Sequence, residues 1–325
     1  MSSAPSDGMI FSNKATSDYD KTFVVLYIVE GLFIVIVNLF LTIRLFTNRN
    51  LRSQKEFIVI GACLFFDIIF GMTYFSAGVY RAILLTLYDY FPLVSMFDCF
   101  ATVHNQLFII ITVMAGITLL FTSFDRFICV FFPFYYMKLQ VEYAYMLMFL
   151  PYLIIIPLWV PGAITAFDSH EVKNFTMNCL MNQAMTVQYY VLYRTIRIVC
   201  TTACLFIYFP IFIKMCVSIY NHTKIAPGSS KNGKRLLSMT KTVALITGST
   251  ICLFTVPDII TYFSPFINSN VMYLMNLNKG TVNILIFLTT QKCLRDLMFP
   301  RSARQPSAML PSRSRTNHTT LVIQY

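Results

Sequence analysis

Residues 23–45 read FVVLYIVEGLFIVIVNLFLTIRL, a run whose only charged residues are Glu30 and Arg44. A helix needs about 20 apolar residues to cross the hydrocarbon core of a bilayer, so this run is long enough to span it. Six further runs of similar character lie at residues 57–80, 96–121, 143–165, 188–214, 236–263 and 271–291. Together they predict an all-α membrane protein, a seven-transmembrane helix bundle over residues 23–291.

The composition agrees with a membrane protein. The chain has 325 residues, of which 57% are hydrophobic and 12% are charged, and its mean hydropathy is +0.65. Soluble domains carry about 25% charged residues, so a soluble globular class is excluded. Seven spans use about half of this length, which leaves room for loops and tails but not for another domain.

The first 20 residues are polar and lack the short apolar core of a cleaved signal peptide. We therefore expect residues 1–22 to form an extracellular N-terminal tail and the first span to act as a signal anchor. With the N-terminus outside, most of the 25 Lys and Arg residues fall on the cytoplasmic side. The expected location is the plasma membrane, with the C-terminus in the cytoplasm. The net charge of +11 then reflects topology and contact with anionic membrane lipids, so we expect no nucleic-acid partner.

Cys99 and Cys179 are the two cysteines near the outer side in this topology. Their pairing would tie the loop before the fifth span across the mouth of the bundle, and two unpaired small residues are the alternative. Asn174 begins an Asn-Phe-Thr glycosylation acceptor in the same loop. The acceptors at Asn221 and Asn317 fall on the cytoplasmic side and should stay unmodified.

At the cytoplasmic end of the third span, Asp125, Arg126 and Phe127 are followed by Pro133 and Tyr136. This arrangement resembles the DRY signature of rhodopsin-like G-protein-coupled receptors, in which a proline and a tyrosine follow the arginine at the same spacing. Further markers of that family stand in order along the chain: Asn38, Asp67, Pro210, Pro257 and the segment NILIF at residues 283–287, which is similar to NPxxY.

One departure is Thr255, at the position of the family's toggle tryptophan. Degenerate motifs on an intact plan are most similar to the nematode serpentine chemoreceptors. The resemblance implies a chemosensory receptor that binds an extracellular small molecule or short peptide and activates a heterotrimeric G protein. A neuropeptide-type receptor is the nearest alternative, and a membrane transporter or a ligand-gated channel is the alternative from another class.

The resemblance also implies residue roles. It places the G-protein switch at Asp125, Arg126, Phe127, Asn283 and Phe287, with Asp125 holding the Arg126 guanidinium in the inactive state. Phe108 stands where amine receptors carry an aspartate, and Leu277 stands where opsins carry the retinal-binding lysine. Amine and retinal ligands are therefore not expected.

A buried polar core is predicted from Asn38, Asp67 and Lys279. The run 271–291 is diluted by polar residues, which a span tolerates where they face the bundle interior. Lys279 lies four residues before Asn283, on the same helix face. In the resembled family the aspartate at Asp67 binds sodium, and we hypothesise that the Lys279 ammonium takes the place of that ion. The alternative is a Lys279 side chain that extends outward to the headgroups.

The expected ligand pocket lies in the outer half of the bundle. Its residues are His104, Asn105, Phe108, Asp258, Tyr262 and Arg194, with Gln106 and Arg197 beside them. Such a pocket would be aromatic with few polar anchors. For each of these residues, ordinary packing or a surface role is an equally open alternative.

After the seventh span, residues 292–299 alternate apolar and charged residues as an amphipathic membrane-surface helix does. Cys293 in it is a palmitoylation candidate or an ordinary free cysteine. Residues 300–325 have the composition of a disordered cytoplasmic tail.

Motifs for other classes are missing from the sequence. No Walker or G-x-S-x-G motif occurs, so no enzyme activity, metal or cofactor is expected. A transporter would predict two similar halves, which we do not find. A channel of the insect odorant-receptor type would place the C-terminus outside, against the distribution of basic residues.

Overall fold

The computed structural model describes residues 18–87, 92–225, 231–263 and 269–298. Six of its helices are long and apolar enough to cross a membrane. They are α1 (Asp18–Thr47), α3 (Lys55–Leu87), α5 (Val103–Phe131), α7 (Val141–Asp168), α8 (Val187–Ile225) and α11 (Ser269–Thr290). The protein is therefore a helical multi-pass membrane protein.

Short elements connect the long helices. They are α2 (Arg49–Arg52), α4 (Met96–Ala101), α6 (Pro133–Lys138), the 3-10 turn η1 (Met181–Gln183), α12 (Lys292–Met298), and the strands β1 (Leu93–Val94) and β2 (Phe175–Thr176). The strands pair antiparallel, with Leu93 opposite Thr176. The expected amphipathic segment at 292–299 thus contains the helix α12.

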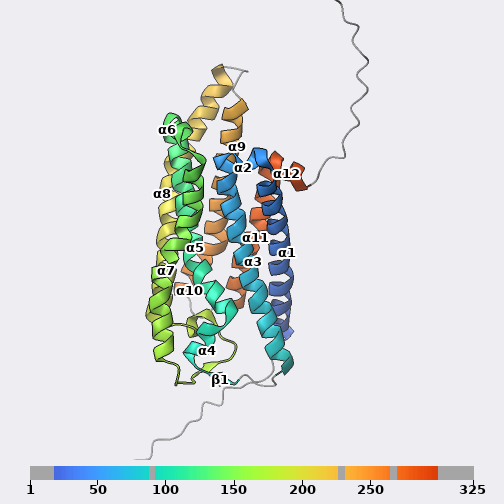
Figure 1. Cartoon of the computed structure of the whole chain (residues 1–325), viewed down its shortest axis with the longest axis vertical. Coiled ribbons are helices and arrows are strands. Elements are labelled where there is room, and N and C mark those ends of the chain that lie inside the picture. Colours follow the sequence, from blue (N-terminus) through green and yellow to red (C-terminus); the bar gives the residue numbers. More distant parts are fainter. Residues whose placement is uncertain (1–17, 88–91, 226–230, 264–268, 299–325) are drawn as a thin grey trace, which may run out of the picture.

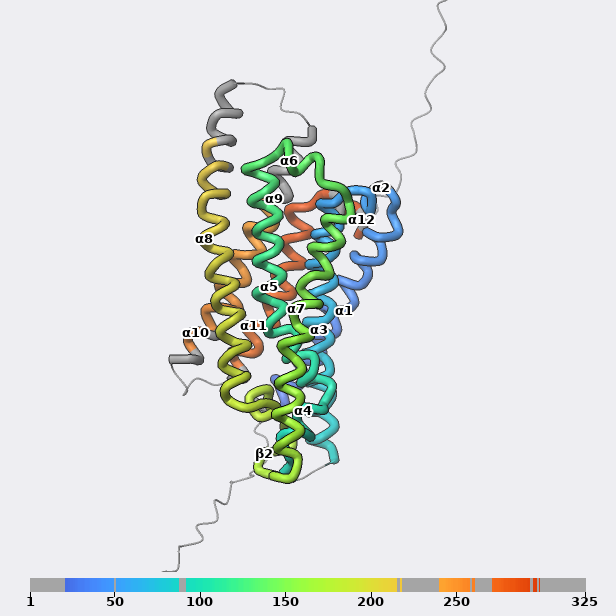
Figure 2. The backbone as a smooth tube through the Cα atoms, turned by 60° about the vertical axis from the view of Figure 1, so that its left-hand side comes forward, coloured from blue at the N-terminus to red at the C-terminus, as the bar shows by residue number. Residues whose placement is uncertain are grey.

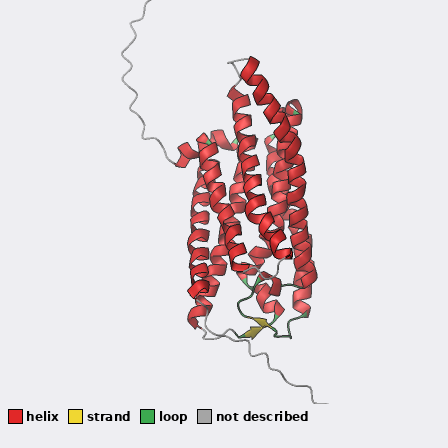
Figure 3. Ribbon diagram, turned by 180° about the vertical axis from the view of Figure 1, so that it is seen from behind, coloured by secondary structure: helices red, strands yellow, loops and turns green. Residues whose placement is uncertain are grey.

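The long helices lie side by side in one bundle, as Figures 1 and 3 show. Helix α5 is central, since it packs against α3, α7, α8 and α9. Helix α1 packs along α3. The two ends of the bundle differ: α4 and the β1–β2 pair lie at one end, and α2, α6 and α12 lie at the other (Figures 1 and 2).

The exposed and buried surfaces are arranged as a bilayer requires. Large apolar side chains are exposed on the outer faces, including Val29 at 61%, Leu153 at 61% and Phe206 at 74%. Polar side chains such as Asn38 and Asp67 are buried between the helices. In water this distribution would be unfavourable, whereas in lipid the outer faces meet hydrocarbon and the polar groups meet one another.

Helices α1 and α3 approach closely because glycine replaces a side chain at their contact. A Cβ atom added at Gly31 would lie 2.8 Å from the backbone nitrogen of Phe75 and 2.9 Å from the carbonyl oxygen of Gly71. No side chain fits there without moving one backbone from the other. Small residues of this kind allow tight helix packing within membranes.

The segment expected to span at 236–263 is helical but composite. It consists of α9 (Lys231–Thr250), the π-helical turn η2 (Ile251–Thr255) and α10 (Val256–Phe263). Within the residues whose side chains the structure describes, its apolar part is Thr240–Thr255. The run 271–291, which the sequence marks as the weakest span, is by contrast one of the six.

Candidate functional site

The first group of site residues lies near the C-terminal end of α5. The Arg126 guanidinium is 1% exposed and forms an ion pair with the fully buried carboxylate of Asp125. A second contact runs from Nη2 of Arg126 to the hydroxyl of Tyr136, 3.5 Å away on α6. Phe127 is partly buried and stacks on Phe131, with ring centres 4.6 Å apart.

Helix α6 is held in place from a second side. The ammonium of Lys55, at the start of α3, donates to the carbonyl oxygens of Tyr136 and Leu139. It also lies 3.9 Å from the centre of the Tyr136 ring. Burial raises the pKa of the Tyr136 hydroxyl, so this group stays neutral beside Arg126. Tyr136 therefore links the Lys55 and Arg126 cations at this end of the bundle.

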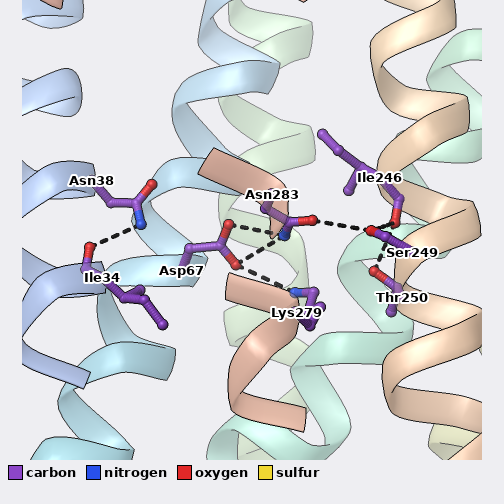
Figure 4. A network of polar contacts seen from close by, with 8 residues as sticks. All are labelled: Ile34, Asn38, Asp67, Ile246, Ser249, Thr250, Lys279 and Asn283. Carbon is purple, nitrogen blue, oxygen red and sulfur yellow. Dashed lines mark hydrogen bonds and ion pairs between the residues drawn. The ribbon is translucent and has the colours of Figure 1, made fainter. Parts of the chain in front are cut away.

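The second group is a polar network between three helices (Figure 4). Nζ of Lys279 on α11 lies 3.3 Å from Oδ1 of Asp67 on α3, and both side chains are buried. Nδ2 of Asn283 donates to Oδ2 of Asp67 at 3.1 Å, and Ser249 of α9 donates to Oδ1 of Asn283 at 3.3 Å. The Asp67 carboxylate thus receives hydrogen bonds from both Lys279 and Asn283 of α11.

Two predicted residues near this network have other contacts. Asn38 is buried, but its Nδ2 atom donates to the carbonyl oxygen of Ile34 within α1 at 2.9 Å. Figure 4 shows it beside Asp67 without a hydrogen bond between them. Phe287 is 1% exposed and packs in the apolar core.

The third group surrounds a cavity of about 220 Å³ between α3, α5, α8, η2 and α11. Its aromatic lining residues are Phe70, Tyr74, Phe108, Tyr190, Phe254 and Tyr273. Arg194 and Arg197 of α8 also line it, and Leu180, Met181 and Asn182 form its wall on the loop side. A concave aromatic site with a few polar groups is typical of small-molecule binding.

The loop that closes the cavity is held by a disulfide between Cys99 and Cys179, which are 80 residues apart. Cys179 has a φ of 46°, in the left-handed region that disfavours residues with a Cβ atom. Its carbonyl oxygen accepts a hydrogen bond from Nδ2 of Asn105 at 3.0 Å, and Nε2 of His104 lies 3.3 Å from it. Such surroundings can hold a strained backbone in place.

His104 and Asn105 therefore do not line the cavity, although the sequence places them in the pocket. Asn105 also donates to the carbonyl oxygen of Cys99 at 2.9 Å. Both side chains are buried beneath the disulfide. Their contacts make them positioning residues for the loop. The sequence gives no sign of this role, because it depends on the fold of a loop some 75 residues away.

The remaining predicted residues lie apart from these groups. Asn174 is exposed, directly before β2. The side chains of Asp258, Tyr262 and Cys293 lie outside the described residues. Within the part of the chain that the structure describes, no three His, Cys, Asp or Glu side chains are close enough together to hold a metal ion.

Phe70, which sequence reasoning missed, connects the cavity with the polar network. Its ring lines the cavity, and Nζ of Lys279 lies 5.3 Å from the ring centre. The rings of Phe70 and Phe254 meet edge to face with centres 6.0 Å apart, and the guanidinium of Arg197 lies 4.4 Å from the centre of the Phe254 ring. A usable signal was the spacing, because Phe70 is one helical turn from Asp67.

Similarity to known proteins adds no family assignment. No protein-family model matches the chain, and no curated protein matches it either. The contacts of the described residues therefore carry the functional proposal.

Proposed function

We propose that this chain is a G-protein-coupled chemosensory receptor, which binds an extracellular small molecule and activates a heterotrimeric G protein. The observation that carries the proposal is the buried Asp125–Arg126 pair near one end of α5, with the cavity near the other end of the same helix. At 1.5 Å per residue, about 27 Å of helix separates Phe108 of the cavity from Arg126. Ligand binding and partner binding would thus occupy opposite ends of one bundle.

The proposal requires seven crossings, and α9, η2 and α10 together supply the seventh. The polar residues that lower the apolar content of this segment face inward. They are Thr240, Thr242, Thr247, Thr250 and Thr255, each at most 6% exposed. A span with a buried polar face and an apolar outer face is compatible with lipid.

The proposed location is the plasma membrane. In the proposed orientation the N-terminus is outside the cell and the C-terminus is in the cytoplasm. Basic residues support it, because α2, α6 and α12 carry Arg49, Arg52, Lys138, Lys292 and Arg295 at one end of the bundle. Cytoplasmic loops carry such an excess of Lys and Arg. The disulfide and the exposed Asn174 are at the other end, as an oxidising exterior requires.

In the proposed mechanism the described structure is the inactive state. The Arg126 guanidinium is paired with Asp125 and contacts the hydroxyl of Tyr136, so it is not available to the G protein. Ligand binding would favour a state in which this pair opens and Arg126 donates to the G protein. The π turn η2, which ends two residues before Pro257, supplies a point at which α9 and α10 can change their angle.

The cavity favours a small molecule over a neuropeptide. Its volume of about 220 Å³ is below the roughly 300–1,000 Å³ of sites that hold drug-sized ligands. A peptide would need the loop at Leu180–Asn182 to leave the mouth, and that loop is tied by the disulfide.

The test measures how fast the chain, purified in nanodiscs and without ligand, promotes nucleotide exchange on purified G-protein heterotrimers. This basal activity can be measured without knowing the ligand. Asp125→Asn should raise exchange several-fold above wild type, because it frees Arg126. Arg126→Ala should abolish exchange, alone and in combination with Asp125→Asn. Lys173→Ala, at an exposed cation of the opposite end, is the matched control and should leave exchange unchanged.

If Arg126→Ala and wild type exchanged nucleotide equally at equal receptor amounts, the switch assignment would be wrong. If all variants conducted ions or transported solute instead, a channel or transporter would replace the receptor. An exposed C-terminal tag on intact cells would also exclude the proposed orientation.

A further inference from the structure

The buried polar residues Asn276, Lys279 and Asn283 lie on one face of α11. Lys279 pairs with the Asp67 carboxylate, and Asn283 donates to it. Asn276 lies one turn before Lys279 and is 6% exposed. Its carboxamide oxygen, Oδ1, is buried and accepts no hydrogen bond from any residue that the structure describes. Asp67 therefore explains two of these polar residues, and the third needs another explanation.

Asn276 borders the cavity. It lines the cavity together with Met272 and Tyr273, which lie one turn before it on α11. A buried acceptor without a donor is costly, so such groups are rare in folded proteins. The terminal torsion of an asparagine side chain is broad, so the carboxamide can turn toward a molecule in the cavity. A hydrogen-bond donor on a bound molecule would then satisfy the oxygen.

Other polar side chains of the cavity lining differ from Asn276. The hydroxyl of Thr112 donates to a carbonyl oxygen of its own helix at 2.6 Å. Asn182 is exposed on the loop, and Arg194 and Arg197 both have further interactions within the protein. Among the described lining residues, the Asn276 carboxamide is therefore the buried acceptor that remains for a ligand.

The aromatic rings of the lining contact one another in series. The Phe108 ring meets Tyr74 edge to face, with centres 5.2 Å apart, and its centre is 5.9 Å from that of Tyr273. The centres of Tyr74 and Phe70 are 5.1 Å apart. Such walls favour a flat aromatic body, which adds further offset or edge contacts. The cavity of about 220 Å³ has room for one ring or two fused rings rather than for a drug-sized molecule.

We infer that the cavity, taken as the ligand site as in the proposed function, binds a small aromatic molecule that donates an O–H or N–H hydrogen bond to Oδ1 of Asn276. Phenols, aromatic alcohols and indoles have this chemistry. An isomer in which a methyl group replaces the donor hydrogen keeps the aromatic body but leaves the oxygen unsatisfied. The site should therefore distinguish the two isomers by the missing hydrogen bond.

The test measures binding to the full chain purified in nanodiscs, with no G protein present. The probes are two pairs of isomers: 4-ethylphenol with 4-methylanisole, and 3-methylindole with 1-methylindole. The members of a pair have the same atoms, and only the first of each carries a donor. The readout is the thermal unfolding midpoint as a function of probe concentration, since a ligand that binds only the folded state raises it. In at least one pair the donor isomer should bind about tenfold more tightly.

Variants of Asn276 identify the acceptor. Asn276→Leu removes the carboxamide at similar volume, so the two isomers of a pair should bind equally. Without ligand, its unfolding midpoint should be no lower than that of the wild type, because an apolar group replaces an unsatisfied polar one. Asn276→Ala provides the same comparison if the leucine side chain disturbs the packing. Asn278→Leu, at an exposed position of the same helix, is the matched control and should keep the preference for the donor isomer.

Equal affinities of the isomers in both pairs would overturn the inference, as would tighter binding of the methylated members or no binding by any of the four probes. A donor preference that both Asn276 variants retain would also overturn it. So would a lower midpoint of both variants without ligand, because the carboxamide would then have a structural role.

The receptor proposal can fail or succeed separately. Basal nucleotide exchange by the Asp125 and Arg126 variants uses no ligand, so it tests the receptor proposal alone. If that comparison fails while the donor preference depends on Asn276, the receptor proposal is wrong and the ligand class stands. If basal exchange follows Arg126 while both isomers bind equally, the ligand class is wrong and the receptor proposal stands.

Discussion

The ammonium of Lys279 lies 3.3 Å from the carboxylate of Asp67, and the two side chains are 5% and 1% exposed. They come from α11 and α3, which are 212 residues apart at this contact. Each charge therefore depends on the other, because a buried charge without its partner is far less stable than the pair.

Lys279→Met should lower the free energy of unfolding by about 3–5 kcal/mol, since it leaves the Asp67 carboxylate without its cation. Asp67→Asn should have a similar effect, because it leaves the buried Lys279 ammonium without its anion. The double variant should lose clearly less than the sum of the two, as expected for residues in contact. Thermal unfolding of the purified protein measures all three. Additive losses would show that the pair is not a unit, and Lys173→Met, at an exposed cation, is the control.

Sodium should not stabilise the wild-type protein specifically, because the Lys279 ammonium already occupies the place of a cation at Asp67. The unfolding midpoint should therefore be the same in sodium chloride and in choline chloride of equal concentration. If the unfolding midpoint rose with sodium and not with choline, the hypothesis that the Lys279 ammonium replaces a sodium ion would be wrong.

Asn105→Ala should loosen the loop over the cavity. The change removes hydrogen bonds of 2.9 Å and 3.0 Å to the carbonyl oxygens of Cys99 and Cys179, at a cost of about 1–3 kcal/mol. Amide hydrogen exchange should become faster in residues 179–183 and stay unchanged in α7. Asn174→Ala, in the exposed part of the same loop, should not change it. Unchanged exchange in Asn105→Ala would contradict the positioning role.

Two glycine substitutions should have opposite effects. At Gly31 an added methyl group would lie 2.8 Å from the backbone of α3, so Gly31→Ala should be destabilising by more than about 1 kcal/mol. At Gly248 on α9 nothing lies within 4 Å of the added Cβ atom. Gly248→Ala should therefore stabilise the helix by up to about 1 kcal/mol. Opposite shifts in unfolding midpoint are the expected result, and equal shifts would show that the α1–α3 contact can adjust.

Asn174 should carry a glycan when the chain is expressed in animal cells, because it is exposed and precedes Phe175 and Thr176. An N-glycosidase should increase the electrophoretic mobility of the wild type but not of Asn174→Gln. Asn221 and Asn317 should remain unmodified in the proposed orientation. A glycan at either of them would contradict the proposed orientation, because it would place that segment outside the cell.

The spans could be predicted from the sequence because lipid imposes a simple requirement of length and apolar content. The helices α1, α3, α7 and α8 each contain the whole run that predicts them, and α11 leaves out only Gln291 at its end. The run 96–121 is divided in the structure, because its first six residues form the separate helix α4 and α5 begins at Val103. The run 271–291 was harder, because hydropathy treats a polar residue alike whether it faces lipid or the bundle. In the structure the polar residues Asn276, Lys279 and Asn283 of this run are buried, and both Lys279 and Asn283 contact Asp67, which offsets the cost of their burial.

The site residues also fall into those that the sequence could place and those that it could not. The contact between Asp67 and Lys279 could be anticipated, because a charge at membrane depth needs a partner and few were present. Phe108 and Arg194 could be placed from their depth alone. The roles of His104 and Asn105 could not, since they depend on the carbonyl oxygen of Cys179 and therefore on the path of a loop.

The polar character of α9 and α11 also has a consequence for biosynthesis. These helices are the least suited to enter lipid alone, since α9 buries its threonines and α11 buries Asn276, Lys279 and Asn283. Both helices follow α1, α3, α5, α7 and α8 in the chain, so they leave the ribosome later than those five. By then α3 is already in the membrane and offers Asp67 to Lys279. The order of the helices in the chain thus provides α11 with polar partners on α3 and α9 before it has to be inserted.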